Sequence, residues 1–349
     1  MTLLYFILFF LCCIFALTEN YLKDRDKKII YIILCGFLIF LPATKSVIDT
    51  PDAESYETMF YGRNNKILQE LTEPTFTQIA SFLNYYGFSV SALFAIYALL
   101  NIVVKGSLIY RMSSMPALTL CIYVSYLYIL HDLIQIRAGA AVAFILFSIF
   151  LYCERKRIWA FVFIGVATLF HYSAIILFVI VFLDNKSLST RGRWILASVV
   201  PIGLLLFLLR FDILSLIPSF MGGEKLEIYK EMSEEGKMDE ISLVNPILWI
   251  KCSVYLLAIY FYDVIKERNK YLPIFMKLMG VSIFVYLIFA KMNAVIANRF
   301  SELFCIVEPF ILTSLANVAR PLWLSQLMIV VLNLMVAGWC VFVLEYILT

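Results

Sequence analysis

A few ionisable side chains stand out in a chain that is otherwise strongly apolar. His171, one of only two histidines, lies within the longest apolar stretch, residues 158–183. Arg137 begins another apolar run, and Arg299 stands three residues before Glu302, on the same face of an expected helix. Ionisable residues at membrane depth are costly, and for that reason they indicate function. Two arginines and a histidine around one cavity would form a site for an anion.

Other polar residues at the ends of apolar runs and in two long polar loops are candidates for substrate binding. Several also have a structural interpretation, because an acidic residue suits a helix N-terminus, a polar pair suits a turn, and an arginine can reach lipid headgroups. Their gathering on one side of the expected topology is the stronger signal. The candidates are Asp52, Glu54, Glu73, His131, Asp132, Gln135, Asn298 and Tyr229.

The composition indicates the class of protein that contains these residues. Of the 349 residues, 63% are hydrophobic and 15% are charged, whereas a soluble domain is about 45–50% apolar and about 25% charged. Apolar runs of about 20 residues recur along the chain. The sequence therefore predicts an all-α polytopic membrane protein with a single transmembrane domain over residues 1–349. No Lys or Arg precedes the first run, so we expect an uncleaved span rather than a signal peptide.

Cofactors and nucleic acids are not expected partners. The eight cysteines lie within or at the ends of apolar runs and form no C-x-x-C pair, so we interpret them as packing residues and expect no disulfide. The chain has no H-E-x-x-H motif and no Cys/His cluster, which argues against a protein-held metal. It also lacks G-x-x-x-x-G-K-[ST] and G-x-G-x-x-G.

The topology depends on whether the chain breaks at His171. If 158–183 is a pair of half-helices that enter and leave on one side, the inner segments hold 15 Lys and Arg and the outer segments hold 9; a straight span gives 13 and 11. The positive-inside rule favours the broken arrangement. We therefore expect about ten full transmembrane helices plus a broken, re-entrant pair near His171. Their predicted ranges are 2–18, 29–44, 88–110, 117–131, 136–153, 158–170, 172–183, 194–210, 244–262, 273–291, 301–319 and 322–347.

This topology places both termini and two long loops, 45–87 and 211–243, on the outer side. In the first loop, Thr50-Pro51-Asp52 predicts one helix start, and Thr72-Glu73-Pro74 predicts another helix that ends at Gly87. The second of these helices has one apolar face and is expected to lie on the membrane surface. In the other loop, Leu226, Tyr229 and Met232 predict a short amphipathic helix.

Several segments resemble the EpsG/Wzy-type polysaccharide polymerases. The segment IQIRAGAAVAFILFSIFLYCERKRIWAFVFIGVATLFHYSAIIL resembles the central block of that family, with Arg137 and His171 at its two marked polar positions. DAESYETMF and EPTFTQIASFLNYYG resemble elements of the first outer loop, and NRFSELF resembles a late element at Arg299. One departure is Ala138, where the family usually has a glutamine-like residue. The resemblance covers residues from about 48 to 310.

The resemblance implies an enzyme, an inverting glycosyltransferase that polymerises oligosaccharide repeat units in O-antigen or exopolysaccharide biosynthesis. It implies that a growing glycan is transferred from undecaprenyl diphosphate to a new lipid-linked repeat unit, at the periplasmic face of the bacterial inner membrane. Implied partners are these lipid-linked oligosaccharides, membrane lipids, a chain-length regulator and a flippase. A GT-C-like bundle is compatible with this chemistry.

Specific roles follow for the catalytic candidates. Arg137 and Arg299 would bind the leaving diphosphate, and Glu302 would orient Arg299. Asp52, Glu73, Glu302 and His171 are candidates for the base. Histidine is the only one of these residue types with an ordinary pKa near neutrality, about 6.5, so we favour His171 as base or as the group that positions the acceptor.

Two other functions remain open at the level of sequence. A ligase would use the same lipid donor with a different acceptor, and sequence does not separate it from a polymerase. A non-enzymatic transporter of lipid-linked glycans would favour symmetry between the two halves of the chain. No internal repeat of fixed period is present.

Overall fold

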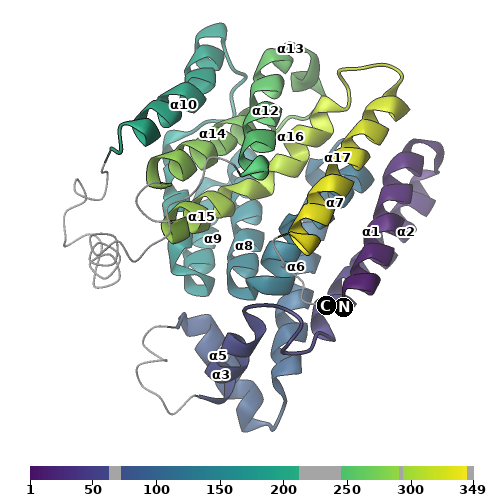
Figure 1. The fold of residues 1–349 in the computed structure, drawn as a ribbon, viewed down its shortest axis with the longest axis vertical. Helices are drawn as coiled ribbons and strands as arrows, with labels where there is room; N and C mark the ends of the chain where they lie inside the picture. The colour runs from purple at the N-terminus through teal and green to yellow at the C-terminus, as the bar shows by residue number, and fades with distance from the viewer. Residues whose placement is uncertain (63–71, 212–244, 291–293, 344–349) are drawn as a thin grey trace.

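The computed structural model describes residues 1–62, 72–211, 245–290 and 294–343. All regular structure in these ranges is helical, and they contain no β-strand. Most helices pack side by side in one bundle, and α3 (Ala53–Tyr61) and α5 (Pro74–Tyr85) form a separate layer at one end of it (Figure 1). The loop expected at 211–243, with Tyr229, lies almost wholly outside the described residues.

The remaining helices follow the apolar runs, and prolines mark several of their starts. Five helices, α5, α7, α12, α14 and α16, have a proline in the first turn. Gly87, at φ +74°, follows the end of α5 as predicted. The other helices are α1 (Thr2–Thr18), α2 (Asp24–Ala43), α6 (Val90–Met112), α7 (Pro116–Ser125), α8 (Ile136–Cys153), α9 (Arg157–Phe170), α10 (Thr190–Leu208), α12 (Pro246–Tyr260), α13 (Tyr262–Ile265), α14 (Leu272–Phe289), α15 (Ala294–Phe304), α16 (Glu308–Leu315) and α17 (Leu322–Phe342).

Short segments of other helical types interrupt the bundle. The 3₁₀ segments are η1 (Glu19–Tyr21), η3 (Tyr172–Phe182), η5 (Lys266–Arg268) and η6 (Cys305–Val307), and η2 (Ile129–Ile134) is a π-helix. A π-helical turn inside a helical bundle is rare and often lies at a functional site. Here η2 directly precedes α8, the helix that carries Arg137.

The number of helices that can cross a membrane is smaller than the sequence predicts. By length and composition, six helices of the described part qualify, and a bent pair formed by α12 and residues 262–268 raises the number to seven. The expected ten is not reached because α7 and α16, at two of the predicted full spans, have only 10 and 8 residues, whereas about 20 are needed to span a bilayer. In addition, α2 begins with five consecutive charged residues.

The break expected at His171 is present. His171 has an extended backbone, with φ −155° and ψ 115°, and it separates α9 from η3. The rings of Phe161 and Phe178 stack with centroids 6.2 Å apart, although a continuous helix would separate these residues by about 25 Å. The hydroxyl of Tyr152 donates to the carbonyl of Leu183 at 2.6 Å. The chain therefore reverses at His171 and returns to the end from which α9 starts.

The connections between the helices gather at that same end of the bundle. The Lys270 ammonium pairs with Glu154 at 2.7 Å, and the Asn185 amide donates to the Lys270 carbonyl at 3.0 Å. The Asn269 amide donates to the carbonyl of Met112. These contacts join four inner segments of the predicted topology, residues 111–116, 154–157, 184–193 and 263–272, which together hold ten Lys and Arg. The α3 and α5 layer lies at the opposite end (Figure 1).

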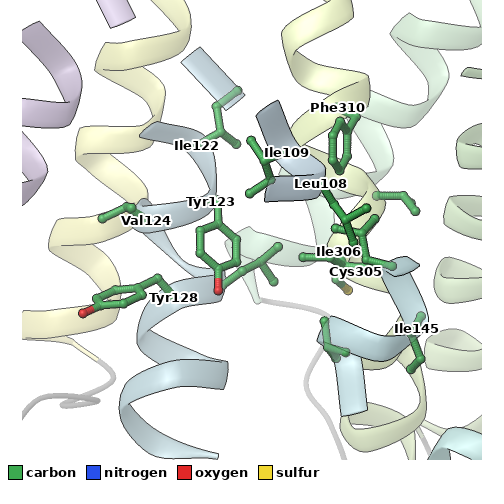
Figure 2. Packing of buried hydrophobic residues seen from close by; sticks show 14 of the residues in the cluster. Leu108, Ile109, Ile122, Tyr123, Val124, Tyr128, Ile145, Cys305, Ile306 and Phe310 are labelled. Carbon is green, nitrogen blue, oxygen red and sulfur yellow. The ribbon is translucent and has the colours of Figure 1, made fainter. Parts of the chain in front are cut away.

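One large apolar core holds the central helices together. Side chains of α6, α7, α8, η6 and α16 meet in it, among them Leu108, Tyr123, Ile145, Ile306 and Phe310 (Figure 2). The backbones of α8 and η2 approach each other closely at Gly139. A Cβ atom on Gly139 would lie 1.9 Å from the carbonyl oxygen of His131, so only glycine fits there.

Candidate functional site

Glu73 joins the outer layer to the bundle at the break in the chain. One oxygen of its carboxylate lies 3.0 Å from Nδ1 of His171, and the other accepts a hydrogen bond from the Arg137 guanidinium. The hydroxyl of Thr75 also donates to the carbonyl of Leu169, two residues before His171, at 2.8 Å. The arrangement brings together three residues that the sequence singled out, and it makes Glu73 the common partner of the other two.

Local structure explains why Glu73 is available for this role. Glu73 occupies the N-cap position of α5, where an acidic side chain often accepts from backbone N–H groups of the first turn. Its side chain makes no such bond, and Pro74 leaves that turn with one donor fewer. The carboxylate instead extends toward the bundle. Its burial, with a side chain only 6% exposed, is matched by its two donors.

Aromatic rings fix the position of Arg137. The guanidinium carbon lies 5.4 Å from the ring centroid of Tyr56 and 5.6 Å from that of Phe76, distances typical of cation–π contacts. The two rings, from α3 and α5, are themselves 5.9 Å apart. The side chain of Arg137 remains 20% exposed. Its planar group is therefore held between the outer layer and α8 and still reaches the surface.

The charge state of Glu73 determines the tautomer of His171. Burial alone raises the pKa of Glu73, but the hydrogen bond to His171 and the charge of Arg137 outweigh it and lower the pKa to about 2. Glu73 is thus ionised near neutral pH and can only accept hydrogen bonds. Nδ1 of His171 must then carry the proton, which leaves the lone pair of a neutral ring on Nε2. This geometry suits a base whose orientation is set by a carboxylate.

Asp52 and Lys45 extend the charged cluster within the first loop. Burial raises the pKa of Asp52, and the charges of Arg137, Lys45 and Arg299 act in the opposite direction. The buried Lys45 ammonium donates to the carbonyl of Leu133 at 2.5 Å and lies 4.4 Å from the ring centroid of Phe94. Burial lowers the pKa of Lys45 to about 7. The Asp52 carboxylate therefore experiences the charges of cations from three separate parts of the chain.

Residues of α15 add a further side to the site. Arg299 is exposed, Asn298 is half-buried, and Glu302 is buried. The amide of Gln135 lies 3.5 Å from the Glu302 carboxylate. The charge of Arg299 also acts on the Glu302 carboxylate, and the predicted role of Glu302 in orienting Arg299 stays a prediction. Arg299, which is exposed, and Arg137, which is partly exposed, are the arginines of this cluster that can meet an anion from outside.

His131 and Asp132 do not form the surface turn that sequence analysis considered. Both lie in η2 and are buried. The Asp132 carboxylate pairs with the Lys105 ammonium at 2.6 Å and accepts a hydrogen bond from the Tyr123 hydroxyl. The π-helical turn directs these side chains inward, so they are part of the interior rather than of an outer face.

Glu54 and Tyr229 are the two remaining candidates for substrate binding. Glu54 is exposed in the first turn of α3, and within the described ranges no contact joins it to Arg137, Glu73 or His171. Tyr229 lies outside the described residues. Groups of three or more side chains able to hold a metal ion are absent from the part of the chain that was described.

Sequence analysis missed three lysines that the structure places among these groups. Lys45 follows α2 directly, and Lys105 and Lys251 lie within apolar helices. The Lys251 ammonium is 2.9 Å from the sulfur of Cys305, one turn beyond Glu302. A lysine inside an apolar run is a detectable signal, because its charge is costly at membrane depth. A lysine near a helix end is a weaker signal, because its charge can reach the headgroups.

Comparison with known proteins identifies the family of this chain. A family model described as the EpsG family matches residues 28–347, which is most of the chain. No curated protein and no solved structure matches the sequence.

Proposed function

Because this chain belongs to the EpsG family, we propose that it is a polysaccharide polymerase that acts on lipid-linked repeat units. The observation that carries this proposal is the contact of Glu73 with both His171 and Arg137. It combines a carboxylate-oriented imidazole with a guanidinium at the edge of a helical bundle. In a glycosyl transfer from a lipid diphosphate, a guanidinium can bind the leaving diphosphate and an imidazole can take the proton of the attacking hydroxyl.

The proposed reaction is a displacement at the anomeric carbon of the growing glycan. A hydroxyl of the fresh lipid-linked unit attacks that carbon, and Nε2 of His171 takes the hydroxyl proton. The bond between the carbon and the diphosphate oxygen breaks, and undecaprenyl diphosphate leaves with the electron pair. Arg299, which is exposed, binds the negative charge that develops on the diphosphate, and the remaining N–H groups of Arg137 assist it.

Glu73 acts as a positioning residue in this scheme. It keeps the proton on Nδ1 of His171 and stabilises the imidazolium that forms after proton transfer. Asp52, on which the charges of Arg137, Lys45 and Arg299 act, would accept a hydrogen bond from a hydroxyl of the acceptor sugar. Gln135 and Asn298 are the neutral polar groups that flank Glu302 and Arg299 and could bind sugar hydroxyls.

The proposed setting is a bacterial inner membrane. Six helices of suitable length and apolarity support a multi-pass membrane protein. The basic connections gather at the end opposite to the α3 and α5 layer, which supports placing that layer and the site on the periplasmic side. The partners are then undecaprenyl-diphosphate-linked oligosaccharides, and a flippase and a chain-length regulator would act before and with the enzyme.

Reconstitution tests this proposal directly. The purified full-length chain is placed in liposomes with a synthetic lipid-linked repeat unit, and the products are separated by length. A ladder of products that disappears with His171→Ala supports a polymerase. Transfer of a single unit to a lipid-core or protein acceptor, with no ladder, identifies a ligase and refutes polymerisation. Movement of the lipid-linked unit across the bilayer without any new glycosidic bond identifies a transporter.

A further inference from the structure

A cavity of about 350 Å³ lies between α10 and α12, apart from the cluster around Glu73. Thr190, Arg193 and Trp194 line it from the first turns of α10, and Tyr260 lines it from the last turn of α12. This is the end of the bundle where the basic connecting segments meet. The cavity therefore combines a basic side chain with aromatic rings at the ends of two apolar helices.

Arg193 has unused hydrogen-bonding capacity at this cavity. One of its terminal nitrogens pairs with Asp263 at 2.7 Å, and its guanidinium lies 5.8 Å from the ring centroid of Tyr262. Its Nε atom is buried and has no hydrogen-bond partner among the described residues. An arginine offers five N–H donors in a planar fork that matches phosphate oxygens. The pair with Asp263 occupies only part of that fork.

The rest of the cavity has the properties of a site for a lipid. Its walls continue along the helices as Ala197, Leu256 and Ile259, all apolar. Trp194 and Tyr260 are 74% and 78% exposed, and such rings typically lie at the headgroup level of a bilayer. Only 17% of the apolar window of α10 is buried inside the protein, so α10 lies at the edge of the bundle and faces the bilayer.

Local charge selects the headgroup. Arg193 and Lys266 lie at the polar end, and Asp263 pairs with both of them. The balance is positive, and basic pockets between transmembrane helices bind anionic headgroups. We propose that this cavity binds an anionic glycerophospholipid of the membrane, with its phosphate on Arg193, its headgroup against Trp194 and Tyr260, and an acyl chain along Leu256 and Ile259. This site is independent of the proposed polymerase activity.

Fluorescence of Trp194 tests the proposal, because this ring lines the cavity. The full-length protein is reconstituted into phosphatidylcholine bilayers that contain a minor fraction of dibrominated phosphatidylglycerol or of dibrominated phosphatidylcholine. The difference between the wild type and Trp194→Phe isolates the signal of Trp194 from the other four tryptophans. We expect brominated phosphatidylglycerol to quench Trp194 at about fivefold lower mole fraction, the effect of one basic residue at an anionic surface.

Matched variants distinguish a built site from a general basic surface. Arg193→Ala should remove the preference for phosphatidylglycerol, whereas Arg191→Ala, the same charge change on an exposed neighbour, should keep it. Arg193→Lys keeps the charge without the fork and should retain only part of the preference. Asp263→Asn removes the partner of Arg193 and should keep or strengthen the preference, which shows that the site survives without that ion pair.

Three results would overturn the proposal. The first is equal quenching by the two brominated lipids in the wild type. The second is an equal loss of preference in Arg191→Ala and Arg193→Ala, which would mean a diffuse charge effect. The third is relief of quenching by millimolar glycerol phosphate or inorganic phosphate at constant ionic strength, which would mean a site for a soluble phosphate rather than for a lipid.

Discussion

Two carboxylates in this protein are paired with cations in opposite surroundings. Asp132 pairs with Lys105 inside the bundle, and both side chains are 0% exposed. Glu73 pairs with Arg137 and His171 at the junction between the bundle and the outer layer, where these two partners are 20% and 15% exposed. The two clusters thus contain similar groups but differ in their access to the surface.

The difference separates a structural pair from the one that we propose to be functional. A closed ion pair cannot exchange protons or ligands, and the removal of one partner leaves a buried charge that is costly. A partly open group can meet a substrate, and its carboxylate can orient an imidazole without being consumed. Changes at Asp132 should therefore act on stability, and changes at Glu73 should act on activity.

The largest expected effect is the loss of activity in Glu73→Gln. A neutral amide cannot satisfy two positively polarised donors, so His171 loses its orientation and Arg137 loses its partner. We expect polymer formation in liposomes to fall about 100-fold or more, the usual contribution of a positioned base, with an unchanged amount of folded protein. Glu57→Gln, on α3, is the matched control and should keep wild-type activity. Normal activity in Glu73→Gln would contradict a functional role for the Glu73 cluster.

The second effect is on stability and concerns the closed pair. Asp132→Leu leaves the Lys105 ammonium buried without its partner and should lower the free energy of unfolding by about 3–5 kcal/mol. Combining it with Lys105→Met should restore most of that loss, because a buried pair can be replaced by apolar groups. Unfolding in detergent measures both variants. If Asp132→Leu alone is as stable as the double variant, the Lys105 ammonium is not left buried without a partner, and the pair is not sealed inside the bundle.

A smaller effect tests the backbone contact that supports η2. Gly139→Ala places a methyl group against the carbonyl of His131 and should destabilise the protein by about 1–3 kcal/mol, the usual cost of overpacking. Gly165→Ala, on α9, adds the same methyl group where no atom lies within 4 Å. The control should unfold at the wild-type temperature or slightly above it. Equal behaviour of the two variants would contradict the close approach of η2 and α8.

The smallest effect is expected from acid and is local to the outer layer. The pKa of Glu73 is lowered from 4.5 to about 2, so its stabilising contacts are complete above pH 4.5 and are lost as the pH falls through about 2. Pepsin, which works in this range, should cleave within α5 more slowly in the wild type than in Glu73→Gln at pH 4. The two rates should converge near pH 2. Equal rates at pH 4 would show that Glu73 does not hold the layer.

Part of this arrangement could be predicted from the sequence because polar residues interrupt apolar runs. The break at His171 follows from such an interruption, and the start of α5 follows from Pro74 after Glu73. Family membership agrees with the resemblance seen in the central block. A polar residue within an apolar run has few explanations, so its position carries information.

The partners of these residues could not be predicted in the same way. Glu73 is 64 residues from Arg137 and 98 from His171, and no periodicity connects positions so distant. The number of spans was overestimated because an apolar run does not reveal where a helix changes to a 3₁₀ or π-helical segment. For the same reason, the sequence favoured a turn at Asp132 and gave no sign of its pair with Lys105.

A double-mutant cycle between Glu73→Gln and His171→Ala tests the central claim, that Glu73 acts largely by positioning His171. Polymerisation rates of the wild type, the two single variants and the double variant are measured in liposomes under identical conditions. If Glu73 acts through His171, the double variant should retain clearly more activity than the product of the two single losses, because the second change removes an interaction already absent. Losses that multiply would show that the two residues act independently and would contradict the account.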